Sequence, residues 1–254
     1  MEKIKSGAMG FTAGTWPPDS GRPTLLFIHG SGESSVLWDA QVSGLSKNFN
    51  TVALDLPGHG ASDGPGLDTI EGYTRTVAAF IENLEIPNPV PCGLSIGGAI
   101  VQQLLLDYPS RIKAGILVST GARLRVMPQI FAAIEKDYGQ FITMSRTFAA
   151  SDKTAADLLE PLMRASAECS PLVTAGDFRA CDHFDVMERL GEIMLPVLII
   201  SAEDDKMTPP KYSDFLEKRI RGAFRCRIKE AGHVVPVEKP GKVNAAIMDF
   251  LNSL

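Results

Sequence analysis

Three widely separated parts of the chain carry side chains that together could transfer an acyl group. Ser95 stands in Gly93-Leu94-Ser95-Ile96-Gly97, and a serine with glycines two positions to either side is typical of a nucleophile on a sharp strand-to-helix turn. Chance alone gives such a match in about one chain in ten of this length. The hydroxyl also needs a base to accept its proton and an acid to orient that base. Ser95 therefore predicts catalysis only together with a histidine and a carboxylate.

The chain has only four histidines, and their surroundings separate them. His29 and His59 lie in glycine-rich turns, where a histidine more often braces a loop than performs catalysis. His183 lies in a stretch with helical spacing, where surface or packing roles are typical. His233 follows the apolar-alternating run at 223–229, and so lies in a loop at the carboxyl end of an expected strand. His233 is the best candidate for the base.

The orienting acid is expected at another strand end, between the serine and the histidine in the sequence. The apolar run at 114–118 is followed by no carboxylate, whereas the run at 197–200 is followed by Glu203, Asp204 and Asp205. Spacing alone does not choose among these three carboxylates. The helix expected directly after Ser95 places the backbone N–H of Ile96 at a helix N-terminus, where it could stabilise an oxyanion.

The elements that would position these residues alternate along the chain. Short apolar runs at 24–28, 51–54, 114–118 and 197–200 predict buried strands, and the intervals are long enough for helical crossovers. Helical spacing at 69–84 and 96–108 fills two of these intervals. We therefore expect an α/β fold with a mostly parallel twisted sheet flanked by helices. The strand before Ser95 contains Pro89 and Pro91 and is expected to be short or irregular.

Residues 122–189 interrupt this alternation, because they contain helical patterns but no strand run. We interpret them as a helical lid inserted into an α/β core made of residues 1–121 and 190–254. Apolar side chains of the lid could wall a substrate cavity, although most such side chains simply pack a helix onto its core. The candidates for substrate binding are Met127, Phe131, Met144 and Phe148.

Composition excludes several classes of protein. The 254 residues are 44% hydrophobic and 22% charged, as in ordinary globular domains rather than disordered chains. The net charge of −5 disfavours nucleic acid and anionic membrane surfaces as partners. The four cysteines lack Cys-x-x-Cys spacing and are expected to be free thiols. No apolar stretch follows Lys3 and Lys5 near the start, and no apolar run is long enough to cross a bilayer, so we expect a cytoplasmic location. Basic residues between Lys218 and Lys229 are interpreted as the charged face of an edge strand.

Together the motifs resemble those of the α/β-hydrolase superfamily, in its lidded esterase, enol-lactonase and cofactor-free haloperoxidase branch. The matching segments, in chain order, are LLFIHGSG at 25–32, ALDLPGHGASD at 53–63, CGLSIGG at 92–98, EDDKMTP at 203–209 and AGHVVPVEKP at 231–240. The resemblance implies that the acid is Asp205, four residues before the loop proline. It implies that the backbone N–H of Ser31 is a second oxyanion donor beside that of Ile96. It also implies that the reaction needs no cofactor and no metal.

The expected activity is hydrolysis of an ester-like bond, in a carboxylic ester or lactone of a small apolar molecule, through an acyl-enzyme. Ser95 would be the nucleophile, His233 the base and Asp205 the orienting acid. Dehalogenases and epoxide hydrolases of the superfamily place aspartate at the nucleophile position. Ser95 therefore argues that this chain does not resemble either of them. Two alternatives stay open. The same three residues serve carbon–carbon bond hydrolases, perhydrolases and lyases, and a non-catalytic ligand receptor can keep this fold.

Overall fold

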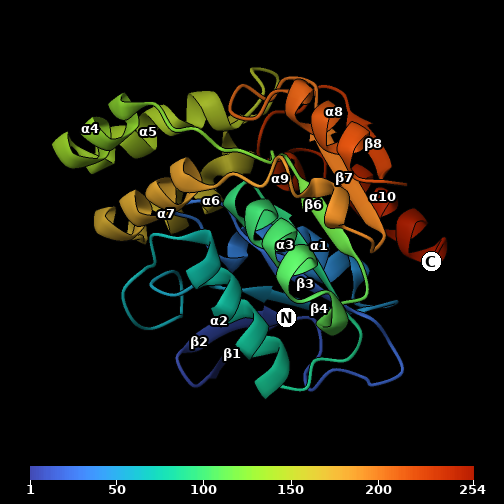
Figure 1. Cartoon of the computed structure of the whole chain (residues 1–254). Helices are drawn as coiled ribbons and strands as arrows, with labels where there is room; N and C mark the ends of the chain where they lie inside the picture. Colours follow the sequence, from blue (N-terminus) through green and yellow to red (C-terminus); the bar gives the residue numbers. More distant parts are fainter.

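Eight strands form one sheet in the computed structural model, which describes residues 1–254 throughout (Figure 1). The strand order is β1-β2-β4-β3-β5-β6-β7-β8, in which β3 to β8 run parallel to one another and β2 is antiparallel to both of its neighbours, β1 and β4. The predicted α/β fold with a mostly parallel sheet is therefore confirmed. The strands are β1 (Glu2–Ser6), β2 (Met9–Ala13), β3 (Thr24–Ile28), β4 (Asn50–Leu54), β5 (Pro89–Leu94), β6 (Gly115–Val118), β7 (Val197–Ala202) and β8 (Phe224–Ile228).

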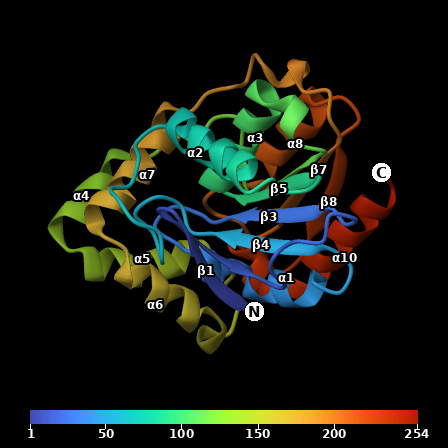
Figure 2. The same ribbon diagram turned by 90° about the horizontal axis from the view of Figure 1, so that it is seen from below.

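Helices cover both faces of this sheet because the central strands are apolar on both sides (Figure 2). In β3, Leu26 and Ile28 belong to the core shared with α2, α3 and α8, whereas Leu25 and Phe27 belong to the core shared with α1 and α10. The helices of these layers are α1 (Asp39–Leu45), α2 (Ile70–Asn83), α3 (Ile96–Asp107), α8 (Pro210–Arg219), α9 (Val235–Glu238) and α10 (Pro240–Asn252). Short 3-10 helices lie at Ser35–Trp38, Pro109–Arg111, Ala156–Leu159 and Leu190–Glu192.

The expectation of an irregular strand before Ser95 is wrong. Strand β5 has six buried residues and pairs with β3 from Pro89 to Gly93. Its pairing with β6 begins only at Cys92, after Pro91, so that neither proline interrupts that ladder. The two residues without an N–H thus precede the part of β5 that pairs with β6, so they remove no hydrogen bond from the β5–β6 ladder.

Both edges of the sheet differ from the sequence expectation. The hairpin of β1 and β2 was not predicted, because Glu2–Ser6 is mostly exposed and its apolar content is low. At the other edge, β8 is the last strand, as expected, but its Arg225 side chain is only 12% exposed. Arg225 and Arg227 both bind Asp214 of α8, at 3.3 and 2.7 Å. These arginines therefore tie β8 to α8. Arg227, and Lys229 just after the strand, are exposed as expected.

Four helices lie between β6 and β7, and they gather beside one end of the sheet (Figure 1). They are α4 (Pro128–Lys136), α5 (Tyr138–Ala149), α6 (Glu160–Glu168) and α7 (Pro171–His183). An isolated bridge between Arg123 and Asp185 joins the two ends of this segment, and the guanidinium of Arg123 binds the Asp185 carboxylate. Ile134, Phe141 and Ile142 form a small apolar cluster of their own with Ala175. We call residues 122–189 the insertion from here on.

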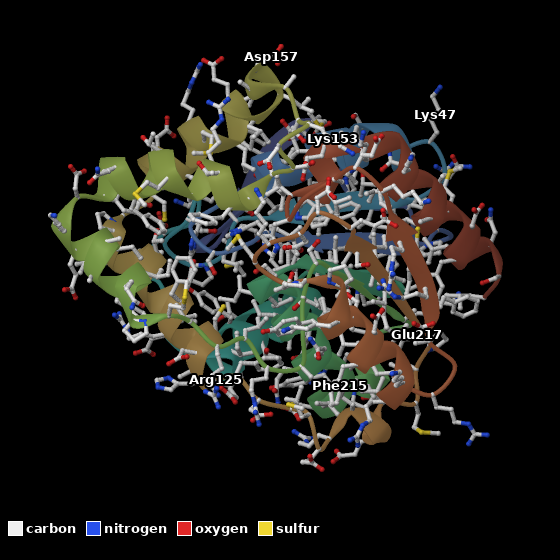
Figure 3. All side chains as sticks on the ribbon, turned by 90° about the horizontal axis from the view of Figure 1, so that it is seen from above. Lys47, Arg125, Lys153, Asp157, Phe215 and Glu217 are labelled. Carbon is white, nitrogen blue, oxygen red and sulfur yellow. The ribbon has the colours of Figure 1, made fainter.

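Charged side chains such as Lys47 and Asp157 project outward from the surface (Figure 3). No helix of the chain is both long enough and apolar enough to span a lipid bilayer.

The close approach of α3 to β3 gives a prediction about stability. A Cβ atom on Gly97 would lie 2.3 Å from the carbonyl oxygen of Ile28. Gly97→Ala is therefore expected to lower the free energy of unfolding by about 3 kcal/mol, because backbone must move to admit the methyl group. Urea denaturation measures this change. The matched control is Gly241→Ala in α10, where nothing lies within 4 Å and stability should stay constant or rise by up to about 1 kcal/mol. Equal effects of the two substitutions would contradict the packing argument.

Candidate active site

Ser95 occupies a strained turn between β5 and α3. Its backbone has φ 55° and ψ −115°, a region that residues with a side chain rarely adopt. The turn is fixed by two hydrogen bonds, from Ser95 N–H to the Val118 carbonyl at 3.1 Å and from Thr120 Oγ1 to the Ser95 carbonyl at 2.8 Å. A Cβ on Gly93 would lie 2.1 Å from the backbone of Gly97, so this turn requires glycine at position 93. The partly exposed Ser95 side chain stands at the carboxyl end of the sheet.

Asp205 and His233 form a buried hydrogen-bonded pair. Nδ1 of His233 lies 3.0 and 3.1 Å from the two carboxylate oxygens of Asp205, and both side chains are almost fully buried. Asp205 also accepts from the N–H groups of Met207 and Thr208 and from Thr208 Oγ1, at 2.8–2.9 Å. Burial acts to raise the pKa of Asp205, but the charge of His233 and these donors hold it below its ordinary value. Asp205 is therefore built to stay ionised beside the imidazole.

The other two carboxylates of the loop after β7 do not contact His233. Glu203 is exposed, and Asp204 accepts a hydrogen bond from Ser151 Oγ at 2.7 Å. Asp204 therefore connects this loop to the insertion, and only Asp205 is within hydrogen-bonding distance of the histidine.

The loop that carries His233 is held by Glu238. The Glu238 carboxylate accepts from the N–H of Gly232 at 2.8 Å, from the N–H of Ser151 at 2.9 Å and from Thr154 Oγ1 at 2.5 Å. The N–H of Val234 donates to the Ala149 carbonyl at 2.9 Å. Gly232, before His233, is thus linked through Glu238 to the stretch 149–154 of the insertion. Val234, after His233, is bonded to that stretch directly.

Ser95 and His233 are not hydrogen-bonded to each other in the structure. Neither Ser95 Oγ nor His233 Nε2 has any other hydrogen-bond partner in the protein, so both atoms are available to a substrate or to one another. Catalytic hydrogen bonds are often long without substrate and shorten in the complex. Burial acts to lower the pKa of His233, but Asp205, and to a smaller extent the nearby carboxylates of Glu33 and Glu238, raise it above its ordinary value. Glu33 belongs to the turn that follows β3, so its charge acts on His233 from that turn.

The turn after β3 leaves one backbone N–H free. The N–H of Gly30 donates to Glu33 Oε2 at 2.9 Å, that of Gly32 donates to Asp177 Oδ2 at 2.8 Å, and that of Glu33 donates to the Gly30 carbonyl at 3.2 Å. The N–H of Ser31 has no acceptor within the protein. The N–H of Ile96, in the first turn of α3, likewise has none, as is usual for a helix N-terminus. These are the two N–H groups predicted to form an oxyanion hole, that of Ser31 from the family resemblance and that of Ile96 from its place at the start of a helix.

The remaining histidines have structural partners. His29 Nδ1 donates to the Gly30 carbonyl at 2.8 Å, and its Nε2 accepts from the N–H of Leu56 at 3.0 Å. Burial and the neighbouring charge of His59 lower the pKa of His29 to about 3, so its ring is neutral. His59 binds Asp177, and His183 is exposed at the end of α7. Sequence reasoning missed Asp177 and Glu33, because neither stands in a motif that separates it from other acidic residues of the chain.

The four candidate substrate-binding residues of the insertion lie on α4 and α5 or next to them. Met127 is 66% exposed, Met144 and Phe148 are each 50% exposed, and Phe131 is half-buried. They therefore lie at the surface of the insertion, and their contact with substrate stays a prediction.

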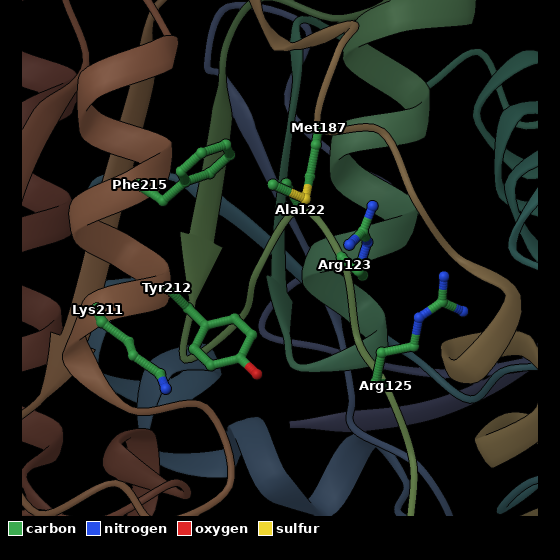
Figure 4. A pocket seen from close by; sticks show the side chains of 7 residues that line it. All are labelled: Ala122, Arg123, Arg125, Met187, Lys211, Tyr212 and Phe215. Carbon is green, nitrogen blue, oxygen red and sulfur yellow. The ribbon is translucent and has the colours of Figure 1, made fainter.

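Two hollows adjoin the insertion. One, of about 210 Å³, lies between the start of the insertion and α8, and its lining combines three cations with apolar side chains (Figure 4). The lining residues are Ala122, Arg123, Arg125, Met187, Lys211, Tyr212 and Phe215. The other, of about 460 Å³, is lined only by polar residues at 151–153 and 203–206, Asp205 among them. No group of three or more histidine, cysteine, aspartate or glutamate side chains is arranged to hold a metal ion.

The sequence matches a known family over most of its length. A model of the "Alpha/beta hydrolase family" matches residues 25–246. The chain is 28% identical over 234 residues to 3-oxoadipate enol-lactonase 2 of Acinetobacter baylyi, covering 89% of this chain and 87% of the relative. It is 26% identical over 229 residues to pimeloyl-[acyl-carrier protein] methyl ester esterase of Nitrosomonas europaea, covering 83% and 88%.

The fold is also that of solved structures. The crystal structure of the enol-lactonase from Burkholderia xenovorans LB400 superposes with a TM-score of 0.85 at 23% sequence identity, covering 99% of this chain and 100% of that one. At this level of identity the similarity establishes the shared fold.

Proposed function

This chain belongs to the alpha/beta hydrolase family, and on that basis we propose that it is a serine hydrolase that cleaves an ester-like bond, in a carboxylic ester or a lactone, through an acyl-enzyme. The observation that carries the proposal is the buried Asp205–His233 pair, whose two residues follow β7 and β8 at the same carboxyl edge of the sheet as the strained Ser95 turn after β5. The relatives named an enol-lactonase and a methyl ester esterase support both kinds of substrate.

The reaction would proceed in two steps. His233 Nε2 accepts the hydroxyl proton as Ser95 Oγ attacks the carbonyl carbon, and Asp205 stabilises the imidazolium through Nδ1. The N–H groups of Ser31 and Ile96 donate to the tetrahedral oxyanion, each contributing about a hundred- to a thousand-fold in rate. The imidazolium then protonates the leaving oxygen, which leaves an acyl group on Ser95. Water, deprotonated by His233, releases the acid and restores the serine.

We also propose that the insertion acts as a lid over this rim. Its stretch 149–154 is bonded to the His233 loop, and the half-exposed side chains of Met144 and Phe148 lie just before that stretch. Met207, which follows Asp205, is 41% exposed as well. Apolar side chains in these places would favour a small apolar acyl or alcohol group as substrate.

A panel of acyl substrates tests the proposal. Purified protein is expected to hydrolyse p-nitrophenyl acetate, butyrate or octanoate, an enol-lactone, or several of these, as measured by release of p-nitrophenol or by loss of lactone absorbance. A carbon–carbon hydrolase would act instead on vinylogous diketones. Absence of turnover of every acyl substrate would favour a ligand receptor on this fold.

The pH dependence of hydrolysis follows from the state of His233. The base must be neutral, so kcat/KM should rise with pH through the pKa of His233, which Asp205 raises above its ordinary value of 6.5. The midpoint of this rise is expected above pH 6.5 in the native protein. Asp205→Asn removes the raising charge and should move the midpoint to lower pH.

Glu33 provides the control for this titration. Burial raises the pKa of Glu33 to about 7, so it titrates in the same range. Glu33→Gln should keep an acidic limb in the pH profile, since His233 remains. Loss of the limb in Glu33→Gln, or an unmoved limb in Asp205→Asn, would contradict the assignment of the base.

A further inference from the structure

The free N–H of Ser31 is flanked by two N–H groups that carboxylates occupy. Glu33, in the same turn, accepts the hydrogen bond from the N–H of Gly30. Asp177, which belongs to α7 and is distant in the sequence, accepts the hydrogen bond from the N–H of Gly32. Gly32 has φ +68°, so the turn needs its left-handed conformation at this residue to present its N–H groups as it does. The orientation of the Ser31 N–H is thus determined in part by a side chain of the insertion.

One face of α7 lies along this turn. A Cβ on Gly32 would lie 2.9 Å from Thr174 Oγ1, Asp177 accepts from Gly32, and Cys181 Sγ lies 3.7 Å from Ser31 Oγ. Residues 174, 177 and 181 have the i, i+3, i+7 spacing of a single helix face. Three successive positions of that face therefore contact two adjacent residues of the turn.

Asp177 is fully buried, and its carboxylate accepts hydrogen bonds from three donors. Besides Gly32, it accepts from His59 Nε2 at 2.9 Å and from Tyr73 Oη at 2.5 Å. His59 Nδ1 lies 3.1 Å from the Pro57 carbonyl, which can only accept, so both ring nitrogens of His59 carry a hydrogen. Burial acts to lower the pKa of His59, but Asp177 raises it to about 10. Inside the protein, the Asp177 carboxylate therefore pairs with an imidazolium at His59.

We propose that Asp177 is a positioning residue of the active site, which holds the turn at residues 30–33 so that the Ser31 N–H points at the oxyanion. The inference rests on the proposed function, because it assigns a purpose to the oxyanion donor of that reaction. It makes transition-state stabilisation depend on α7 being docked, although Asp177 itself is fully buried and bonds to groups of the protein. A carboxylate that served packing alone would affect stability and leave the rate per folded molecule unchanged.

The test replaces Asp177 in the full chain and counts active sites. Asp177→Ala should lower kcat for p-nitrophenyl butyrate about 100-fold per Ser95 titrated with a p-nitrophenyl phosphonate, with KM changed less than about threefold. Affinity for a trifluoromethyl ketone, whose adduct carries an oxyanion, should fall by a similar factor. Asp177→Asn should recover much of this loss, because its amide oxygen still accepts from Gly32. Tyr73→Phe is the matched control, expected within about threefold of wild type, since it removes one donor to Asp177 and the acceptor of the Leu67 N–H but leaves the bond from Gly32 to Asp177 in place.

Folding of the variants is addressed separately. Asp177→Ala leaves the charge of His59 buried without a partner, so Asp177→Ala/His59→Asn removes both members of the pair and should show the same fall in kcat per site. Hydrogen exchange of the peptide covering residues 29–35 should be at least about tenfold faster in either variant, with β5 and α3 unchanged. Unchanged kcat per site and unchanged exchange in these variants, with Ser95→Ala inactive, would overturn this inference alone. Full turnover by Ser95→Ala would instead overturn the proposed function, while the exchange result would still report on the turn.

Discussion

Replacing Ser95 by alanine should lower kcat for p-nitrophenyl esters by about 10⁴-fold or more, the largest effect of any single substitution in this chain. Without the hydroxyl, no acyl-enzyme forms, and the oxyanion donors can only assist direct attack by water. The fold should be unaffected. Ser95 Oγ makes no hydrogen bond in the protein, and alanine, like serine, carries a Cβ at φ 55°, so the backbone strain at the turn is the same.

Two measurements separate lost chemistry from lost structure in this variant. Far-UV circular dichroism and the urea midpoint of Ser95→Ala should match those of the native protein. Mass spectrometry after a pulse of p-nitrophenyl ester should detect an acyl adduct on the native protein and none on the variant. Retained turnover, or an adduct on another residue, would show that Ser95 is not the nucleophile.

Asp205→Asn should lower kcat by about 10³- to 10⁴-fold, whereas Asp204→Asn should change it by less than about tenfold. The carboxylate of Asp205 keeps a hydrogen on Nδ1 of His233 and so leaves Nε2 free to accept the serine proton. An amide at position 205 can present its NH₂ group to Nδ1 instead, which selects the wrong tautomer of the imidazole. Asp204 contacts Ser151 rather than His233, so its loss affects only the attachment of the insertion.

The two aspartates form a closely matched pair, since they are adjacent and the substitutions are chemically identical. Measuring kcat per titrated Ser95 in both variants removes differences in folding yield. Equal losses in the two variants, or a greater loss in Asp204→Asn, would overturn the assignment of the acid.

The central part of the fold could be predicted from sequence because burial there leaves a strong pattern. Strands β3, β4, β6 and β7 are apolar on both faces, and each coincides with an apolar run. Strand β5 was expected to be irregular because Pro91 has no N–H to donate. The sequence does not show that pairing with β6 begins only after this residue. The hairpin of β1 and β2 escaped prediction because β1 is polar and mostly exposed, and it joins the sheet only by pairing with β2, which in turn pairs with β4.

The candidate site divides in the same way. Ser95, His233 and the acidic loop after β7 stand in local motifs at the ends of strands, where sequence order and sheet topology predict their meeting. Asp177 and Glu33 stand in no such motif. Their roles depend on the backbone N–H groups that they accept from, those of Gly32 and Gly30, and the sequence does not show these contacts. From a single sequence, a buried carboxylate on a helix cannot be distinguished from an exposed one, because most carboxylates lie at the surface.

The attachments of the insertion have a consequence for engineering. Its stretch 149–154 is anchored through Glu238 and Val234, and α7 is anchored through Asp177, whereas α4 and most of α5 make no hydrogen bond to the catalytic loops. Combinatorial libraries confined to residues 128–146 would therefore diversify the wall offered to a ligand and leave both anchors in place. Replacing a segment that contains residues 149–154 or Asp177 would break these bonds. Such a replacement would therefore have to be designed together with the bonded residues of the core, Glu238, Val234 and Gly32.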